Sequence, residues 1–130
     1  MRKDIEFPEV KDVYVAIVRE WNEDFSSQDW NSYIINAGST VLETVIVVTK
    51  GYDDTRKTSL LRHVIKTIPG RSFAKIELIQ EELFAFTNEF HVSFYSEGKL
   101  YDKKYIFEPY SIQEKDIKSV PLLDKEGVYR

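Results

Sequence analysis

Two histidines, His63 and His91, are the residues of this chain best suited to acid–base or metal chemistry. An imidazole changes its charge near neutral pH, and its neutral form binds metals. A shared site would require the fold to bring both rings together with carboxylates. Both histidines lie in segments with strand character and are far apart in the sequence. We therefore predict ordinary surface or strand-edge histidines, no catalytic residue and no metal ligand.

Two pairs of adjacent acidic residues could also bind a cation or transfer a proton. Asp53 and Asp54 follow a glycine, but the alternating oxygen ligands and terminal glutamate of an EF-hand loop are missing, which favours a polar turn. Glu81 and Glu82 would point to opposite faces of a strand and could not share one site there. We expect this second pair to be a solvated connection.

Missing residue types exclude further chemistry. The chain has no cysteine, which excludes disulfides, thiolate zinc sites, iron–sulfur clusters and cysteine nucleophiles. It also lacks the phosphate-binding loop, the dinucleotide fingerprint, the nucleophile elbow and the zinc-binding helix motif. With 18 basic and 22 acidic residues the net charge is −4, which disfavours binding to a phosphate backbone. We predict no cofactor and no nucleic-acid partner.

The sequence also carries no signal for a membrane segment. No run approaches the ~20 apolar residues that a membrane-spanning helix needs. The N-terminal stretch has basic side chains but no apolar region of the kind found in a secretory leader. We therefore predict no membrane partner and a cytoplasmic location.

Three aromatic residues, Trp21, Phe25 and Trp30, bracket one polar loop and are the candidate residues for binding a ligand or partner. Aromatic side chains at the end of a β-sandwich can form a patch that binds a protein or a sugar ring. The other interpretation is that both tryptophans cap the core. Basic residues near strand edges are predicted to protect those edges from aggregation: Arg56, Lys57, Arg62, Lys66, Lys103 and Lys104.

The elements that must position these residues are organised around residues 30–52, which hold the densest run of β-branched and aromatic side chains. Asn36 and Gly38 tolerate the positive φ that a tight reversal needs, so the pattern predicts a central hairpin with its turn at residues 36–39. Four successive apolar β-branched residues at positions 45–48 indicate a central strand that is buried on parts of both faces.

Alternating side chains predict further strands around this hairpin. The segments are 13–21, 58–68, 73–80, 90–95 and 99–107, with a break at Pro69-Gly70 and a second hairpin at Glu97-Gly98. Segment 13–21 is apolar on both faces and should be well covered. In segment 73–80, the apolar positions 74, 76 and 78 alternate with Lys75 and Glu77.

About seven short strands in 130 residues, with no strong helix, predict one all-β domain of two antiparallel sheets packed face to face. The domain spans residues 1–130, with 1–10 as a lead-in and 110–130 as a C-terminal tail packed on the body. The tail has little strand character. We expect one helical turn near residues 111–116 and then residues 120–123 lying along the body.

The turns of this pattern resemble those of immunoglobulin-like and fibronectin-type-III-like domains. Residues 35–39 read Ile-Asn-Ala-Gly-Ser before a V-x-V strand, and residues 68–72 read Ile-Pro-Gly-Arg-Ser before another alternating strand. The pattern is similar to small bacterial adhesion-type modules with an N-x-G turn and a later P-G-x-S turn. The resemblance implies an immunoglobulin-like antiparallel β-sandwich of about seven strands, although the cysteine pair of antibody domains is absent.

As a whole, the chain resembles a family of small bacterial proteins without an assigned activity, some of which carry the label of phenylalanyl-tRNA synthetase alpha subunit. The core of such a synthetase needs several hundred residues and an arginine-bearing, glycine-rich strand motif for ATP. This chain has neither. The resemblance therefore implies a fold and no activity.

Together these observations predict a non-catalytic immunoglobulin-like module for protein interaction or a structural role, with an unidentified protein partner or a homo-oligomer. Self-association would use an edge strand or an exposed aromatic face. The alternative is a β-sandwich that binds a small ligand or carbohydrate at the loop end that holds Trp21, Phe25 and Trp30. A ligand would stabilise the second kind of protein against heat, whereas the first would be isolated with its partner.

Overall fold

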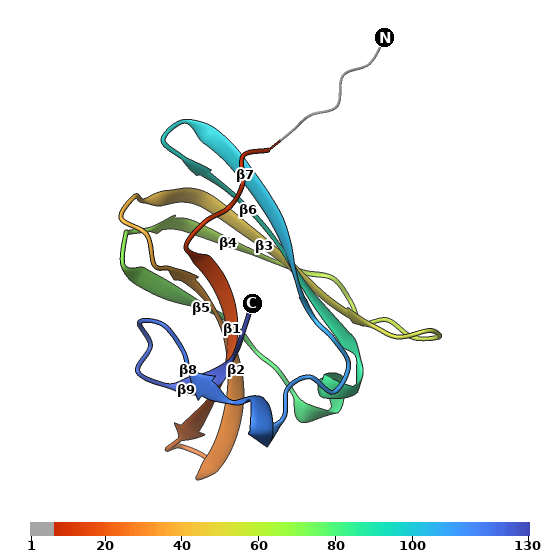
Figure 1. The fold of residues 1–130 in the computed structure, drawn as a ribbon. Helices are drawn as coiled ribbons and strands as arrows, with labels where there is room; N and C mark the ends of the chain where they lie inside the picture. Colours follow the sequence, from red (N-terminus) through yellow and green to blue (C-terminus); the bar gives the residue numbers. More distant parts are fainter. Residues whose placement is uncertain (1–6) are drawn as a thin grey trace.

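The computed structural model describes residues 7–130, which form two antiparallel β-sheets packed face to face (Figure 1). The sheets have the strand orders β5-β2-β1-β9-β8 and β4-β3-β6-β7. The predicted all-β antiparallel sandwich is confirmed. The strands are β1 (Val13–Asn22), β2 (Ser27–Asn36), β3 (Leu42–Tyr52), β4 (Leu61–Ile68), β5 (Ser72–Leu78), β6 (Thr87–Ser96), β7 (Lys99–Phe107), β8 (Lys118–Ser119) and β9 (Glu126–Tyr129), with 3-10 turns η1 (Glu81–Ala85) and η2 (Glu114–Asp116).

The main core lies between the sheets and is built by the alternation of side chains along each strand. In β1, Val13, Val15 and Ile17 are buried in the same cluster as Val45 and Val47 of β3. Full burial of such a side chain stabilises the fold by roughly 1.5–3 kcal/mol relative to its exposure. The facing apolar surfaces therefore hold the two layers together.

The outer face of the five-stranded sheet is also apolar, and the C-terminal tail covers it. Ala16 and Val18 of β1 have no exposed surface and cluster with Val120 and Leu123 of the tail. Figure 1 shows this tail beside β1 and β2. The prediction that the first strand is well covered is confirmed. The predicted lead-in, residues 1–10, lies largely outside the described residues, which begin at position 7.

The predicted central hairpin at residues 36–39 is wrong, because β2 and β3 belong to different sheets. β2 pairs with β1 and β5, whereas β3 pairs with β4 and β6. Neither Ala37 nor Gly38 has positive φ, so the two-residue turn favoured in hairpins is not formed there. The chain instead crosses from one sheet to the other at this corner.

The side chain of Asn36 explains why the corner is stable. Its buried amide nitrogen donates hydrogen bonds to the carbonyl oxygens of Thr40, Ile68 and Pro69 at 2.8, 3.1 and 3.0 Å, and its oxygen accepts one from the Gly38 nitrogen at 3.2 Å. These bonds join this corner to the corner at Pro69-Gly70. Such long-range bonding cannot be predicted from the local turn residues.

Hairpins join β1 to β2, β3 to β4 and β6 to β7. β1 and β2 are joined by a short turn at which Ser26 has a φ of 47°. β6 and β7 are joined at Glu97 and Gly98, whose φ values are 51° and 76°, as the left-handed positions of a tight hairpin turn require. The predicted second hairpin is therefore confirmed.

The expectation that the tail has little strand character is wrong, because β9 pairs with β1 and β8 pairs with β9. Arg130 and Val15 exchange backbone hydrogen bonds at 3.0 and 3.1 Å. The expected turn near residues 111–116 is present as η2. Within residues 7–130 no helix is long and apolar enough to cross a membrane.

We expect Gly127→Ala to detach β9 from β1. A Cβ at this position would lie 2.2 Å from the Ile17 carbonyl oxygen, so the backbone would have to shift. Such overpacking costs about 1–3 kcal/mol in the free energy of unfolding, which urea denaturation measures. Gly38→Ala is the matched control, since its Cβ would have no neighbour closer than 3.5 Å. Equal stability of the two variants would contradict the close approach of β9.

Candidate functional site

A bulge in β5 aims one carboxylate into the sandwich. Tyr33 pairs with Lys75 and Ser32 pairs with Glu77, so the two strands shift register by one residue at Ile76. Ile76 and Glu77 consequently both face the interior, where Ile76 joins the core. Alternation grouped Glu77 with Lys75 and apart from Ile76, and the structure differs because alternation assumes a strand without a bulge.

Glu77 is the centre of a polar network that joins both sheets. Its Oε1 accepts a hydrogen bond from Thr49 Oγ1 at 2.9 Å and lies 2.6 Å from His63 Nε2. A carboxylate only accepts hydrogen bonds, so Nε2 carries the proton in this contact. The Ser32 hydroxyl donates to the Glu77 carbonyl oxygen at 2.9 Å and accepts from the Glu77 nitrogen at 3.1 Å. Thr49 of β3 and His63 of β4 thus fix the carboxylate, and Ser32 of β2 fixes the backbone of the same residue.

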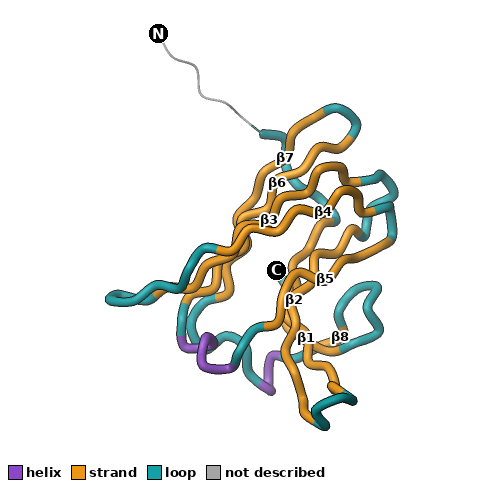
Figure 2. The backbone as a smooth tube through the Cα atoms, turned by 180° about the vertical axis from the view of Figure 1, so that it is seen from behind, coloured by secondary structure: helices purple, strands orange, loops and turns teal. Residues whose placement is uncertain are grey.

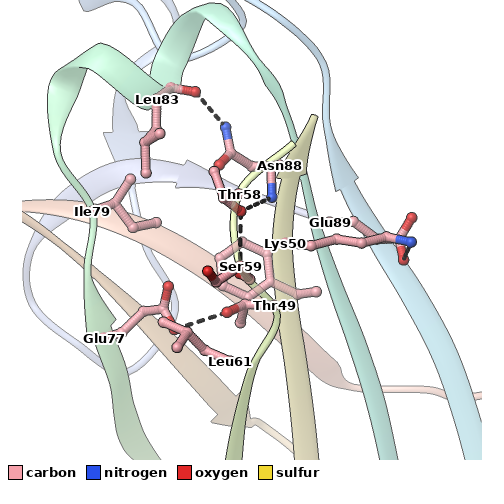
Figure 3. Close-up of a pocket in the computed structure, with 12 residues that line it drawn as sticks. Thr49, Lys50, Thr58, Ser59, Leu61, Glu77, Ile79, Leu83, Asn88 and Glu89 are labelled. Carbon is pink, nitrogen blue, oxygen red and sulfur yellow. Dashed lines mark hydrogen bonds and ion pairs between the residues drawn. The ribbon is translucent and has the colours of Figure 1, made fainter. Parts of the chain in front are cut away.

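A cleft of about 210 Å³ opens above this network (Figure 3). The Asn88 amide donates to the carbonyl oxygens of Leu83 and Phe86 at 2.8 and 3.2 Å and so holds η1 at the rim. Thr58 Oγ1 accepts from the Gly51 nitrogen at 2.8 Å and holds the opposite rim. The lining combines apolar and polar side chains, namely Leu61, Ile79, Leu83 and Phe90 with Thr49, Thr58, Ser59, Glu77, Asn88 and Glu89.

A second carboxylate cluster lies on the outer face of the four-stranded sheet. His91 Nε2 lies 2.9 Å from both oxygens of Asp102, and Ser93 Oγ donates to Asp102 Oδ2 at 2.8 Å. Partial burial would raise the pKa of Asp102, but the hydrogen bonds from His91 and Ser93 outweigh it and lower this pKa. All three side chains are half-buried.

Neither cluster has the order of a nucleophilic triad. In such a triad the imidazole lies between the hydroxyl and the carboxylate, so that it can take the hydroxyl proton. Here the carboxylate lies between the other two groups, in Thr49–Glu77–His63 and in Ser93–Asp102–His91. The arrangement suits charge-assisted binding and positioning.

The structure does not bring the two histidines together. His63 pairs with Val47 and faces the interior side of the four-stranded sheet, whereas His91 pairs with Val48 and faces the outer side. In the described part of the chain no three His, Asp or Glu side chains gather as metal ligands. Each histidine instead lies beside one carboxylate.

The three candidate aromatic residues are placed differently from one another. Trp21 and Phe25 lie at the end of the β1–β2 hairpin and are 55% and 78% exposed, whereas Trp30 is 8% exposed. The Trp30 ring packs edge-on against Phe84 at 5.2 Å, and its Nε1 donates to Glu81 Oε1 at 3.2 Å. Trp30 therefore caps the core, and only the other two aromatics share a free surface.

The acidic pairs lie in connections, as predicted. Asp53 Oδ1 accepts backbone hydrogen bonds from Thr55 and Arg56 at 2.9 and 2.7 Å. The Thr55 backbone N–H, together with the side chain of Arg56, lowers the pKa of Asp53 to about 2. Glu81 and Glu82 begin η1 and are exposed.

Sequence reasoning missed the residues that form the cleft floor. Thr49 shares its side of the strand with Val45 and Val47, and nothing local predicts the bulge that brings Glu77 to it. Comparisons with protein-family models, with curated proteins and with solved structures found no match. Function is therefore inferred from the residues and their geometry.

We expect Thr49→Val and Glu77→Gln to be non-additive in stability. Thr49→Val removes the hydroxyl donor and Glu77→Gln removes the charge of its acceptor, and a hydrogen bond to a charged group contributes about 1.5–3 kcal/mol. Urea denaturation of both single variants and of the double variant measures the coupling free energy. Coupling of at least about 0.5 kcal/mol is expected, and additive effects would contradict the network.

We expect Asp102→Asn to destabilise the protein near neutral pH but much less in acid. Folding lowers this pKa, so the unfolded chain binds the proton more tightly. The stabilisation is therefore complete above the ordinary pKa of 3.8 and is lost as the pH falls through the lower folded value. The unfolding midpoints of the unchanged protein and of the variant, measured across this pH range, should converge in acid. A constant difference would contradict the assigned shift.

Proposed function

We propose that this protein is a non-catalytic interaction module, and that it binds other chains along the side of the sandwich where β4 and β5 form the sheet edges. We name this surface the β4–β5 side. Figure 2 shows the two strands on the same side of the molecule. The single observation that carries the proposal is the contrast between these edges and the other two.

The edges at β7 and β8 are protected against pairing. β7 carries Lys99, Lys103 and Lys104, and β8 has only two residues. Short edge strands and lysines are common means of preventing sheet-to-sheet association. Of the basic residues predicted to protect edges, Lys103 and Lys104 lie on β7, whereas Arg62 and Lys66 lie on β4 beside exposed apolar side chains.

The β4–β5 side instead exposes large apolar side chains. On β4, Leu61 and Val64 are 49% and 63% exposed, and Leu60 before it is also exposed. On β5, Phe73 and Leu78 are about half exposed. An unpaired strand edge also offers backbone N–H and C=O groups to a partner. Apolar contact and backbone pairing are therefore both available here.

Charge favours an acidic partner segment with apolar side chains. Lys57, Arg62 and Lys66 on or near β4 have no ion-pair partner among residues 7–130. The chain itself carries such a segment at the end of the β1–β2 hairpin, residues 21–26, which we name the hairpin tip. Glu23 and Asp24 of the hairpin tip lack an ion-pair partner within the same described range. The exposed Trp21 and Phe25 lie beside them.

A second copy of the chain is therefore the partner we propose. The hairpin tip lies at the lower end of the molecule in Figure 1, away from β4. One copy can thus present its hairpin tip to the next while its own β4–β5 side stays free. Such head-to-tail contacts produce rings or open chains of copies.

The strand order supports the resemblance to immunoglobulin-like domains. If β1 to β7 are compared with strands A to G, then A-B-E and C-F-G occur as neighbours in the two sheets. β4 pairs with β3 instead of β5, and β9 and β8 extend the A edge. We propose an immunoglobulin-like module on this basis. We also propose that it works in the cytoplasm. The carbohydrate-binding alternative has less support, since Trp30 is buried away from Trp21 and Phe25.

We expect the protein to self-associate through these two surfaces. A hairpin-tip variant, Glu23→Lys with Asp24→Lys, and a β4 variant, Arg62→Glu with Lys66→Glu, should each be monomeric by sedimentation equilibrium. An equimolar mixture of the two should associate again, because the unchanged hairpin tip of one variant can contact the unchanged β4 of the other, and the two reversed surfaces also attract. Association of the unchanged protein should weaken as salt is added.

The matched control is Lys103→Glu with Lys104→Glu on β7, which changes the net charge as the β4 variant does. It should associate like the unchanged protein. If the unchanged protein stays monomeric at all concentrations, the second copy is not the partner. If the β4 and β7 variants behave alike, the β4–β5 side is not the interface.

A further inference from the structure

We propose that the cleft above Glu77 is a binding site for a small organic cation, specifically a primary amine with a short apolar chain. The cleft adjoins the β4–β5 side, and Leu61 belongs to both, but the inference rests on the interior carboxylate of Glu77 and not on the interaction proposal. It depends on three features: a carboxylate oxygen without a partner, apolar walls, and a volume that admits only a small molecule.

The carboxylate of Glu77 has one oxygen to spare. Oε1 is engaged by Thr49 and His63, whereas Oε2 has no hydrogen-bond or ion-pair partner within residues 7–130. Figure 3 shows one carboxylate oxygen directed away from Thr49. The side chain is only 21% exposed, so water screens the charge weakly. A partly buried charge is costly unless it is paired. His63 contacts Oε1 alone, so an ammonium group at Oε2 would complete the pairing.

Positive charge for this carboxylate is scarce in the cleft. Lys50 is the basic residue of the lining, and its Nζ lies 3.6 Å from Glu89 Oε2. Its charge is therefore directed to a different carboxylate. An anionic ligand would meet both glutamates, whereas a cation would meet a carboxylate that still has acceptor capacity.

The walls determine the rest of the ligand. Leu61 of β4, Ile79 after β5 and Leu83 of η1 surround the space beside Glu77. A volume of about 210 Å³ is below the roughly 300 Å³ at which pockets for drug-sized ligands begin. The cleft thus suits an alkyl chain of a few carbons and excludes a peptide or an oligosaccharide.

The carboxylate is also held ready for a ligand. The Ser32 hydroxyl binds both the backbone N–H and the backbone carbonyl oxygen of Glu77. Thr49 and His63 fix Oε1, which fixes the direction of Oε2. A group that is already ordered loses little entropy when it binds. The bulge at Ile76 is the device that places this arrangement inside the sandwich.

The test uses butylammonium as the probe, with 1-butanol and butyrate as neutral and anionic probes of similar size. Each probe is titrated into isotopically labelled protein, and binding is followed through the backbone amide NMR signals of the protein. Butylammonium should give saturable shifts that cluster at Gly51, Leu61, Ile79 and Asn88, and 1-butanol and butyrate should not. Nuclear Overhauser contacts should join its methylene protons to the methyl groups of Leu61 and Ile79.

Glu77→Gln should weaken butylammonium binding at least tenfold, because it keeps the shape but removes the charge. Glu82→Gln is the matched control, since Glu82 lies on η1 outside the cleft lining, and should change the affinity less than twofold. Equal binding of 1-butanol, shifts spread over the acidic surface, or unchanged affinity in the Glu77 variant would each overturn the proposal. If Glu77→Gln does not fold, the probe comparison and the contacts in the unchanged protein decide it.

Discussion

The burial of two apolar sheet faces against each other is the constraint on which every other feature of this protein depends. The interior holds few polar groups, and some of them have partners in the opposite sheet. On one side, the buried Tyr105 hydroxyl of β7 donates to the Val13 carbonyl oxygen of β1 at 2.7 Å, and burial raises the pKa of this tyrosine. On the other side, Glu77 of β5 meets Thr49 and His63 of the opposite sheet. The second side contains the carboxylate of Glu77 and the cleft beside it.

The two sheets also differ in how their outer faces are used. The tail covers the five-stranded sheet with Val120 and Leu123, so that sheet is buried on both faces. The four-stranded sheet keeps a half-exposed outer face with the Asp102 cluster. Strands β9 and β8 extend the five-stranded sheet beyond β1. The edge strands with exposed large apolar side chains are β4 and β5. We therefore locate function on that side.

The local sequence pattern was sufficient to predict the two β-sheet layers but not the connections between them. Alternation in β1, β3 and β6 and the left-handed turn at Glu97 and Gly98 could be predicted, because their causes lie within a few residues. The corner at Asn36 could not, since its amide binds carbonyl groups near residue 68, which are close only in the folded chain. The same holds for the strand pairing of the tail.

The candidate site shows the same division. The exposure of Trp21 and Phe25 agrees with a loop, whereas the burial of Trp30 depends on Phe84 and Glu81, which come from η1. The inward direction of Glu77 depends on one extra residue in β5, and a single shift of register reverses which side chains face the core. A polar residue on an apparently exposed face can thus become the centre of a site.

Hydrogen–deuterium exchange of the unchanged protein at low and high concentration tests the central claim most directly, namely that the β4–β5 side is where this protein meets another chain. We expect the amides along β4 and those at the hairpin tip both to exchange more slowly as the protein concentration rises, while the exchange of the β7 amides does not change. Slower exchange confined to β7, or no change at β4 at any concentration where the protein associates, would contradict it.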